Sequence, residues 1–125
     1  YSQVNFQRTY DEPNSQFTGD DGEYAQEVNG PDSGYVILGG LMQRCYLIKT
    51  DLNGNVQWAK DYTDTNNIYS RFLTRSLVQT SDLGYVITGV YSPNFNLDAA
   101  DILVMNINNN GIVQWAKKYG STVLF

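Results

Sequence analysis

The 125-residue sequence contains no histidine, one cysteine and three prolines, and charged residues make up only 17% of it. Without histidine, the chain lacks the commonest general base and a frequent metal ligand. The single cysteine, Cys45, excludes an intrachain disulfide. No stretch approaches the roughly 18 consecutive apolar residues of a membrane-spanning helix, and no charged and then apolar leader opens the chain. We therefore expect a mature, soluble chain that does not insert into a membrane.

Basic residues are also scarce, since eight of them stand against thirteen acidic residues. The resulting net charge of −5 repels phosphate backbones and anionic lipid headgroups. Nucleic acid is therefore not an expected partner. The chain begins at Tyr1 instead of methionine, which we interpret as a sign of processing or trimming. We accordingly expect an extracellular or cell-surface location.

Aromatic residues are abundant, and both tryptophans lie in a phrase that occurs twice, NVQWAKDY at 55–62 and IVQWAKKY at 112–119. Further upstream, DSGYVILGG at 32–40 matches DLGYVITGV at 82–90. The second copy has seven additional residues, which fall in the segment YSPNFNLDAAD, and insertions of this kind belong in loops. The sequence therefore contains two copies of an internal repeat of about 50 residues. Such a period is typical of propellers and other repeat architectures.

Each copy contains four strand signals, and an Asn-Gly turn joins the third to the fourth. The predicted fold is all-β, with two four-stranded antiparallel propeller-like blades plus an extra N-terminal strand. We place this strand and a linker at residues 1–16, the first blade at 17–67 and the second at 68–125. The extra strand is predicted because FQRTY at 6–10 resembles WAKDY, with Phe6 in the tryptophan position.

The repeated tryptophan phrase predicts a repeated structural joint. Because side chains alternate along a strand, we expect Val56, Trp58, Lys60 and Tyr62 to share one face. The same reasoning places Val113, Trp115, Lys117 and Tyr119 together in the second copy. A tryptophan at this position can wedge between neighbouring sheets. If both are core joints, replacing Trp58 or Trp115 with alanine should cost about 3 to 5 kcal/mol each.

The run YLIKTDLNGNVQWAKDY, followed by SLVQTSDLGYVITG, resembles the tandem propeller-like repeats of many long bacterial and archaeal surface or secreted proteins. It is more loosely similar to the tryptophan-docking repeats of quinoprotein-type propellers. The resemblance covers about Tyr24 to Tyr119, and it implies architecture without implying an activity. Two departures from the family are the presence of only two units and the altered second turn, NNNGI.

A propeller needs a closed ring of about four to eight blades, so the two blades of one chain cannot close a ring alone. Their exposed faces must be covered, either in a longer array or by other copies of the chain. We therefore expect self-association, with Phe6, Tyr10, Trp58 and Trp115 as the assembly residues. The N-terminal strand could pair with the free sheet edge of a neighbour.

Candidate chemistry is sparse. The acidic residues Asp20, Asp21 and Glu23 could hold Ca²⁺, but we interpret them as a solvated loop. The segment DLNGN lacks the glycine and the distal glutamate of a calcium loop, so we interpret it as a hairpin turn. Cys45 aligns with Ile102 of the second copy, which predicts a buried apolar role. We expect no catalytic residue, no metal and no cofactor, and the chain is not predicted to be an enzyme.

Three classes of function fit the predicted fold. The leading hypothesis is a structural module of an extracellular or cell-surface assembly. Its copies self-associate, and a filament is one assembly that they could form. The alternative is a lectin-like module, in which Trp58, Trp115, Tyr62 and Tyr119 are candidate glycan contacts and copies close into a propeller. Small fucose-binding bacterial lectins are similar in having two blades per chain. A fragment of a quinoprotein-type enzyme is disfavoured, because no residues are present that could orient a quinone and its metal.

Overall fold

The computed structural model describes residues 23–30, 32–41, 44–64, 66, 70–93 and 100–120. Within these ranges the chain forms eight strands and no helix. The first sheet contains β1 (Glu23–Glu27), β2 (Tyr35–Leu41), β3 (Arg44–Thr50) and β4 (Val56–Tyr62), and the second contains β5 (Arg71–Gln79), β6 (Tyr85–Ser92), β7 (Asp101–Ile107) and β8 (Val113–Tyr119). In each sheet the strands lie in chain order and every pair is antiparallel. No helix long and apolar enough to span a membrane occurs in the ranges given above.

The prediction of an all-β chain with two four-stranded antiparallel sheets is confirmed. The two sheets fall within the predicted ranges 17–67 and 68–125. The run RSLVQT at 75–80 predicts the first strand of the second sheet, and the observed strand β5 begins earlier, at Arg71. The predicted N-terminal strand, with Phe6 and Tyr10, lies outside the described residues.

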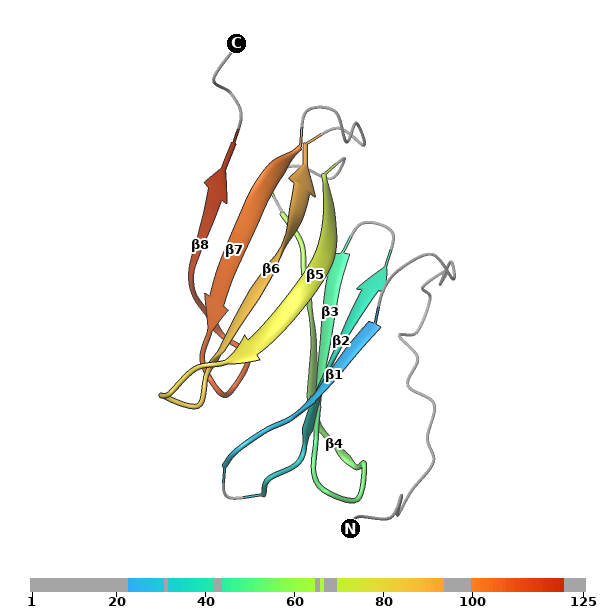
Figure 1. Cartoon of the computed structure of the whole chain (residues 1–125). Coiled ribbons are helices and arrows are strands. Elements are labelled where there is room, and N and C mark those ends of the chain that lie inside the picture. The colour runs from blue at the N-terminus through green and yellow to red at the C-terminus, as the bar shows by residue number, and fades with distance from the viewer. Residues whose placement is uncertain are drawn as a thin grey trace.

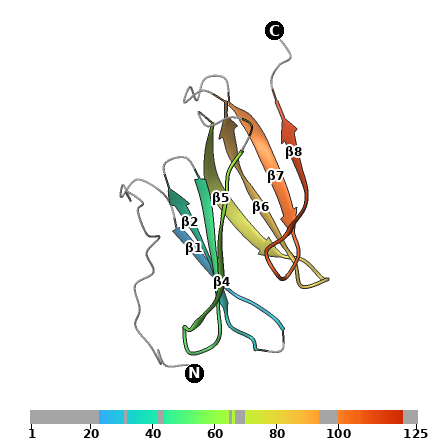
Figure 2. The ribbon, with the colours of Figure 1, turned by 180° about the vertical axis from the view of Figure 1, so that it is seen from behind.

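The two sheets pack face to face, as Figures 1 and 2 show from opposite sides. Strand β5 lies against β1, β2 and β3 of the first sheet. Strand β8 lies on the outer side of the second sheet in both views. The sheets therefore meet most closely along β5. We call the whole region of contact between the two sheets the joint, and it extends from β5 outward to β4, β7 and β8.

The core of the molecule lies in this joint. Alternate residues of the central strands face the opposing sheet, because side chains point to alternate faces along a strand. The buried apolar residues include Val36, Leu38, Cys45 and Leu47 from the first sheet and Phe72, Leu77, Tyr85, Ile87, Tyr91, Leu103, Met105 and Ile107 from the second. The predicted burial of Cys45 is confirmed, and burial raises the pKa of its thiol well above the usual range.

The two Asn-Gly hairpins have the same hydrogen-bond pattern. In the first, the carboxylate of Asp51 accepts hydrogen bonds from the backbone N–H groups of Asn53 and Asn55, at 2.8 and 2.9 Å. In the second, the side-chain oxygen of Asn108 accepts from Asn110 and Ile112, at 2.9 and 3.0 Å. The prediction of hairpin turns is therefore confirmed, and the Asp51 carboxylate is engaged by its own turn.

Only one residue of each turn has a positive φ, namely Gly54 at 82° and Gly111 at 80°. The preceding asparagines do not, so these are not two-residue turns with two left-handed positions. The Gly54 N–H donates a hydrogen bond to the carbonyl oxygen of Asp51, three residues earlier, and Gly111 donates the equivalent bond to Asn108. The left-handed glycine is therefore the last residue of the turn in each hairpin. This arrangement is the longer hairpin loop built on an ordinary turn and a glycine.

One prediction about strand faces is wrong. The register places Trp58 opposite Lys49 but Val56 opposite Thr50, because a β-bulge interrupts the pairing of β3 with β4. The second copy repeats the bulge, with Trp115 opposite Asn106 and Val113 opposite Ile107. A bulge inserts one extra residue and thereby reverses the alternation of side chains. Val56 and Val113 consequently lie on the faces opposite to those of Trp58 and Trp115.

Candidate functional site

Trp58 and Tyr62 reach from β4 across the joint to the second sheet. Both are partly buried and pack against the core. A Cβ atom placed on Gly111 would lie 3.0 Å from Cζ3 of Trp58, so the indole packs directly on the β7–β8 turn. The Tyr62 hydroxyl donates a hydrogen bond of 2.7 Å to the Gly111 carbonyl oxygen. Burial raises the pKa of this hydroxyl, and negative charge on Cys45 would raise it further.

Trp115 and Tyr119 are the repeat counterparts of Trp58 and Tyr62, but they lie on a solvent-exposed surface. Trp115 is 42% exposed and Tyr119 is 54% exposed. Both lie on the face of the second sheet that is turned away from the first sheet, together with Ile102, which is 59% exposed. We call this surface, comprising Ile102, Val104, Trp115, Lys117 and Tyr119, the outer face.

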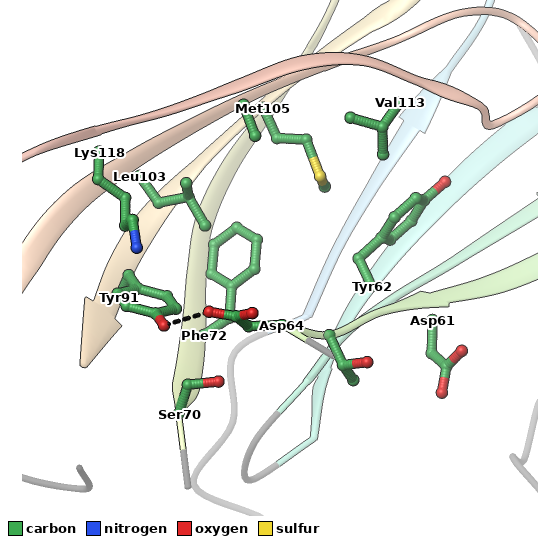
Figure 3. Close-up of a pocket in the computed structure, with 12 residues that line it drawn as sticks. Asp61, Tyr62, Asp64, Ser70, Phe72, Tyr91, Leu103, Met105, Val113 and Lys118 are labelled. Carbon is green, nitrogen blue, oxygen red and sulfur yellow. Dashed lines mark hydrogen bonds between the residues drawn. The ribbon is translucent and has the colours of Figure 1, made fainter. Parts of the chain in front are cut away.

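A hollow of about 540 Å³, here called the apolar cleft, lies between β4 and the face of the second sheet that is turned toward the first sheet. Figure 3 shows its lining, with Met105 and Tyr62 pointing into it from opposite sheets. Phe72, Leu103 and Val113 complete most of the apolar wall. The size and the apolar lining are typical of small-molecule sites. The cleft exists because the two sheets touch along β5 and diverge toward their outer strands.

Polar groups close one edge of the apolar cleft. The Tyr91 hydroxyl donates a 2.5 Å hydrogen bond to the Asp64 carboxylate, drawn as a dashed line in Figure 3. The Lys118 ammonium lies 4.3 Å from the centroid of the Tyr91 ring, which is a cation–π geometry. The Tyr91 hydrogen bond, aided by the Asn66 N–H and by the charge of Lys118, lowers the pKa of Asp64. This edge ties the segment after β4 to β6 and β8.

A second hollow, here called the polar groove, has a volume of about 310 Å³ at the other end of β4. Its lining combines the indole of Trp58 with polar side chains from both sheets. The lining comprises Asn29, Gly30, Asp32, Ser33, Lys49, Gln57, Trp58, Leu83, Tyr85, Asn109 and Asn110. Burial, with a contribution from Asp32, raises the pKa of Tyr85.

Lys49 is the most unusual residue of the polar groove, since it is only 9% exposed. Its ammonium donates hydrogen bonds to the Thr50 carbonyl oxygen at 2.6 Å and to Gln57 Oε1 at 2.9 Å. The Gln57 amide in turn donates to the Asp32 carboxylate. Buried charges are normally paired, whereas both acceptors of Lys49 are uncharged.

The candidate residues named from the sequence separate into three sets. Trp58 and Tyr62 lie together in the joint, and Trp115 and Tyr119 lie together on the outer face. Phe6, Tyr10 and the side chains of the acidic loop at 20–23 lie outside what the structure describes. In the described ranges no three carboxylate, thiol or imidazole groups converge in a way that could hold a metal ion.

Sequence reasoning missed the two hollows. Asp64 and Tyr91 are 27 residues apart and belong to no motif, so only the fold brings them together. Lys49 did carry a signal, because it is the one charged residue within the apolar run CYLI-K-T of β3. Asn109 carried a weaker signal, because the first turn has Leu52 at the same position.

The fold and these surfaces define the chain as an all-β protein of two packed meander sheets with an exposed aromatic face. Comparison with protein-family models, with curated proteins and with solved structures gives no match in any of the three.

Proposed function

We propose that this protein is a structural, non-enzymatic module of an extracellular or cell-surface assembly, in which copies associate head to tail. The observation that carries the proposal is the outer face. It repeats the residues by which the first sheet binds the second, with Trp115 and Tyr119 in place of Trp58 and Tyr62. An exposed apolar patch of this kind is typical of an interaction surface.

The proposed occupant of the outer face is the first sheet of a second copy. The face of that sheet turned away from the joint, here called the back face, carries Ile37, Ile48, Val56 and Ala59. The counterparts of these residues in the second sheet are Ile87, Met105, Val113 and Ala116, which line the existing joint or its cleft. Val56 and Ala59 are exposed, whereas Ile48 is buried, so the outer strand β4 would make most of the contact.

Such an interface joins two different surfaces and is therefore heterologous. Heterologous contacts close into a ring if the rotation per copy permits it, and otherwise continue as a filament. Strand edges offer a second contribution, since β8 pairs only with β7 among the described strands. A strand from a second copy, for which the predicted N-terminal strand with Phe6 and Tyr10 is our candidate, could add to such an edge.

The proposal is tested by light scattering over a range of concentrations. Two isoleucines provide a matched pair of variants: Ile102 on the outer face is 59% exposed, and Ile112 in the β7–β8 turn is 53% exposed. We expect the native chain and Ile112→Lys to exceed the monomer mass of 14.1 kDa as concentration rises, and Ile102→Lys to remain monomeric. A native chain that stays monomeric throughout, or an Ile102→Lys variant that associates normally, would contradict the proposal.

A further inference from the structure

We propose that the polar groove is a binding site for a neutral, hydroxyl-rich ligand, that is, a carbohydrate. This inference does not depend on self-association, because the groove is formed within one chain. It rests on four features of the groove: its chemistry, its charge, the state of Lys49 and the geometry of the loops around it.

The chemistry of the lining suits hydroxyl groups. Asn29, Gln57, Asn109 and Asn110 bring four carboxamides, each of which can both donate and accept. A vicinal diol also donates and accepts, so it can pair with such groups in several orientations. Trp58 adds a partly exposed indole, whose flat surface suits the apolar face of a sugar ring.

The charge of the lining favours a neutral ligand. Among the described residues that line the groove, Lys49 is the only base and Asp32 is the only acid. Gln57 bridges the two, accepting from the ammonium and donating to the carboxylate. The formal charges therefore cancel within the groove. A phosphorylated or strongly anionic ligand would gain no net attraction there and would also meet the overall charge of −5.

Lys49 provides the most specific indication. An ammonium has three donors, and Lys49 uses two of them in the described part of the chain. A buried polar group with unused hydrogen-bonding capacity is costly unless something else satisfies it. A hydroxyl oxygen of a bound sugar would supply the third acceptor without adding charge.

The loops around the groove are held in a fixed and strained geometry. Gln79 of the second sheet clamps the backbone of Asn29, accepting from its N–H at 2.8 Å and donating to its carbonyl at 3.0 Å. Ser33 and Leu83 have φ values of 42° and 67°, and they are the only non-glycine residues with positive φ in the described ranges. Both line the groove. Backbone strain of this kind concentrates at ligand-binding positions.

The test is isothermal titration of the native chain with maltohexaose, cellohexaose, mannohexaose and chitohexaose, with hexagalacturonate as the acidic comparison. We expect at least one neutral oligosaccharide to bind with a Kd below about 1 mM, and hexagalacturonate to bind less tightly. Absence of binding by all four neutral oligosaccharides, or tighter binding of the acidic one, would overturn the proposal.

Two substitutions locate the site. Asn109→Leu installs the residue that the first hairpin already has at this position, Leu52, so the turn should still form. We expect it to weaken binding by about tenfold, the effect of losing one to two hydrogen bonds. The reverse exchange in the other hairpin, Leu52→Asn, should leave the titration unchanged. Lys49→Met should weaken binding as well, and its folding can be checked by circular dichroism. Unchanged binding in Asn109→Leu would refute this location even if Lys49→Met fails to fold.

Discussion

At the scale of single residues, the hydroxyl of Tyr91 makes the stability of the joint depend on pH. Its hydrogen bond is the main cause of the lowered pKa of Asp64, whose ordinary value is 3.8. A carboxyl with a lowered pKa in the folded state contributes stability above its unfolded pKa, and this stability is lost as the pH falls through the folded pKa. The Asp64 interaction should therefore be complete at neutral pH and disappear in acid.

Tyr91→Phe tests this dependence. We expect the variant to lose about 1 kcal/mol or less of unfolding free energy at pH 7, because Asp64 is partly exposed to water. The difference from the native chain should shrink as the pH falls below about 4. Urea unfolding at several pH values measures it. Tyr119→Phe removes a hydroxyl from an exposed tyrosine and should show no such trend. A Tyr91→Phe penalty that stays constant down to pH 2 would exclude the Asp64 carboxylate as its source.

At the scale of strands and hairpins, the sequence predicts most of the fold because its signals are local. Asn-Gly pairs mark the two hairpins, and the repeated tryptophan phrase marks the fourth strand of each sheet. The bulges were not predictable in this way, because a bulge is a property of the pairing between two strands. For this reason the sequence placed Val56 and Val113 on the wrong faces.

The site was predictable only in part, for a related physical reason. Trp58 and Tyr62 repeat with a fixed spacing, so a shared structural role could be inferred from the sequence. The polar groove and the apolar cleft are formed by residues from opposite sheets, such as Lys49 and Asn109, or Asp64 and Tyr91. Their proximity depends on how the sheets pack, which no local pattern specifies.

The two tryptophan strands should respond differently to the same substitution. Trp58 packs on Gly111 within the joint, so Trp58→Ala should cost about 2 to 3 kcal/mol, somewhat less than a fully buried tryptophan. Among the described strands none lies over Trp115, which is 42% exposed, so Trp115→Ala should cost below about 1 kcal/mol in the monomer. Denaturant unfolding at low concentration measures both. Equal losses would show that Trp115 is already covered within one chain.

At the scale of the whole molecule, the chain presents two different outward surfaces. The outer face of the second sheet carries Trp115 and Tyr119, and the back face of the first sheet carries Val56 and Ala59. If copies associate head to tail, each surface can be blocked separately. Ile102→Lys blocks the outer face, and Val56→Lys blocks the back face, where the valine is 51% exposed.

Mixing these two variants distinguishes a head-to-tail contact from a symmetric one. We expect each variant alone to remain monomeric, because every head-to-tail contact needs one intact surface of each kind. In an equal mixture, the intact outer face of Val56→Lys can bind the intact back face of Ile102→Lys. Both remaining surfaces of that pair are blocked, so growth must stop at twice the monomer mass. Sedimentation velocity of the mixture measures this. If Val56→Lys alone forms dimers, the outer face is binding a second outer face, and the assembly is a symmetric dimer instead of a ring or filament.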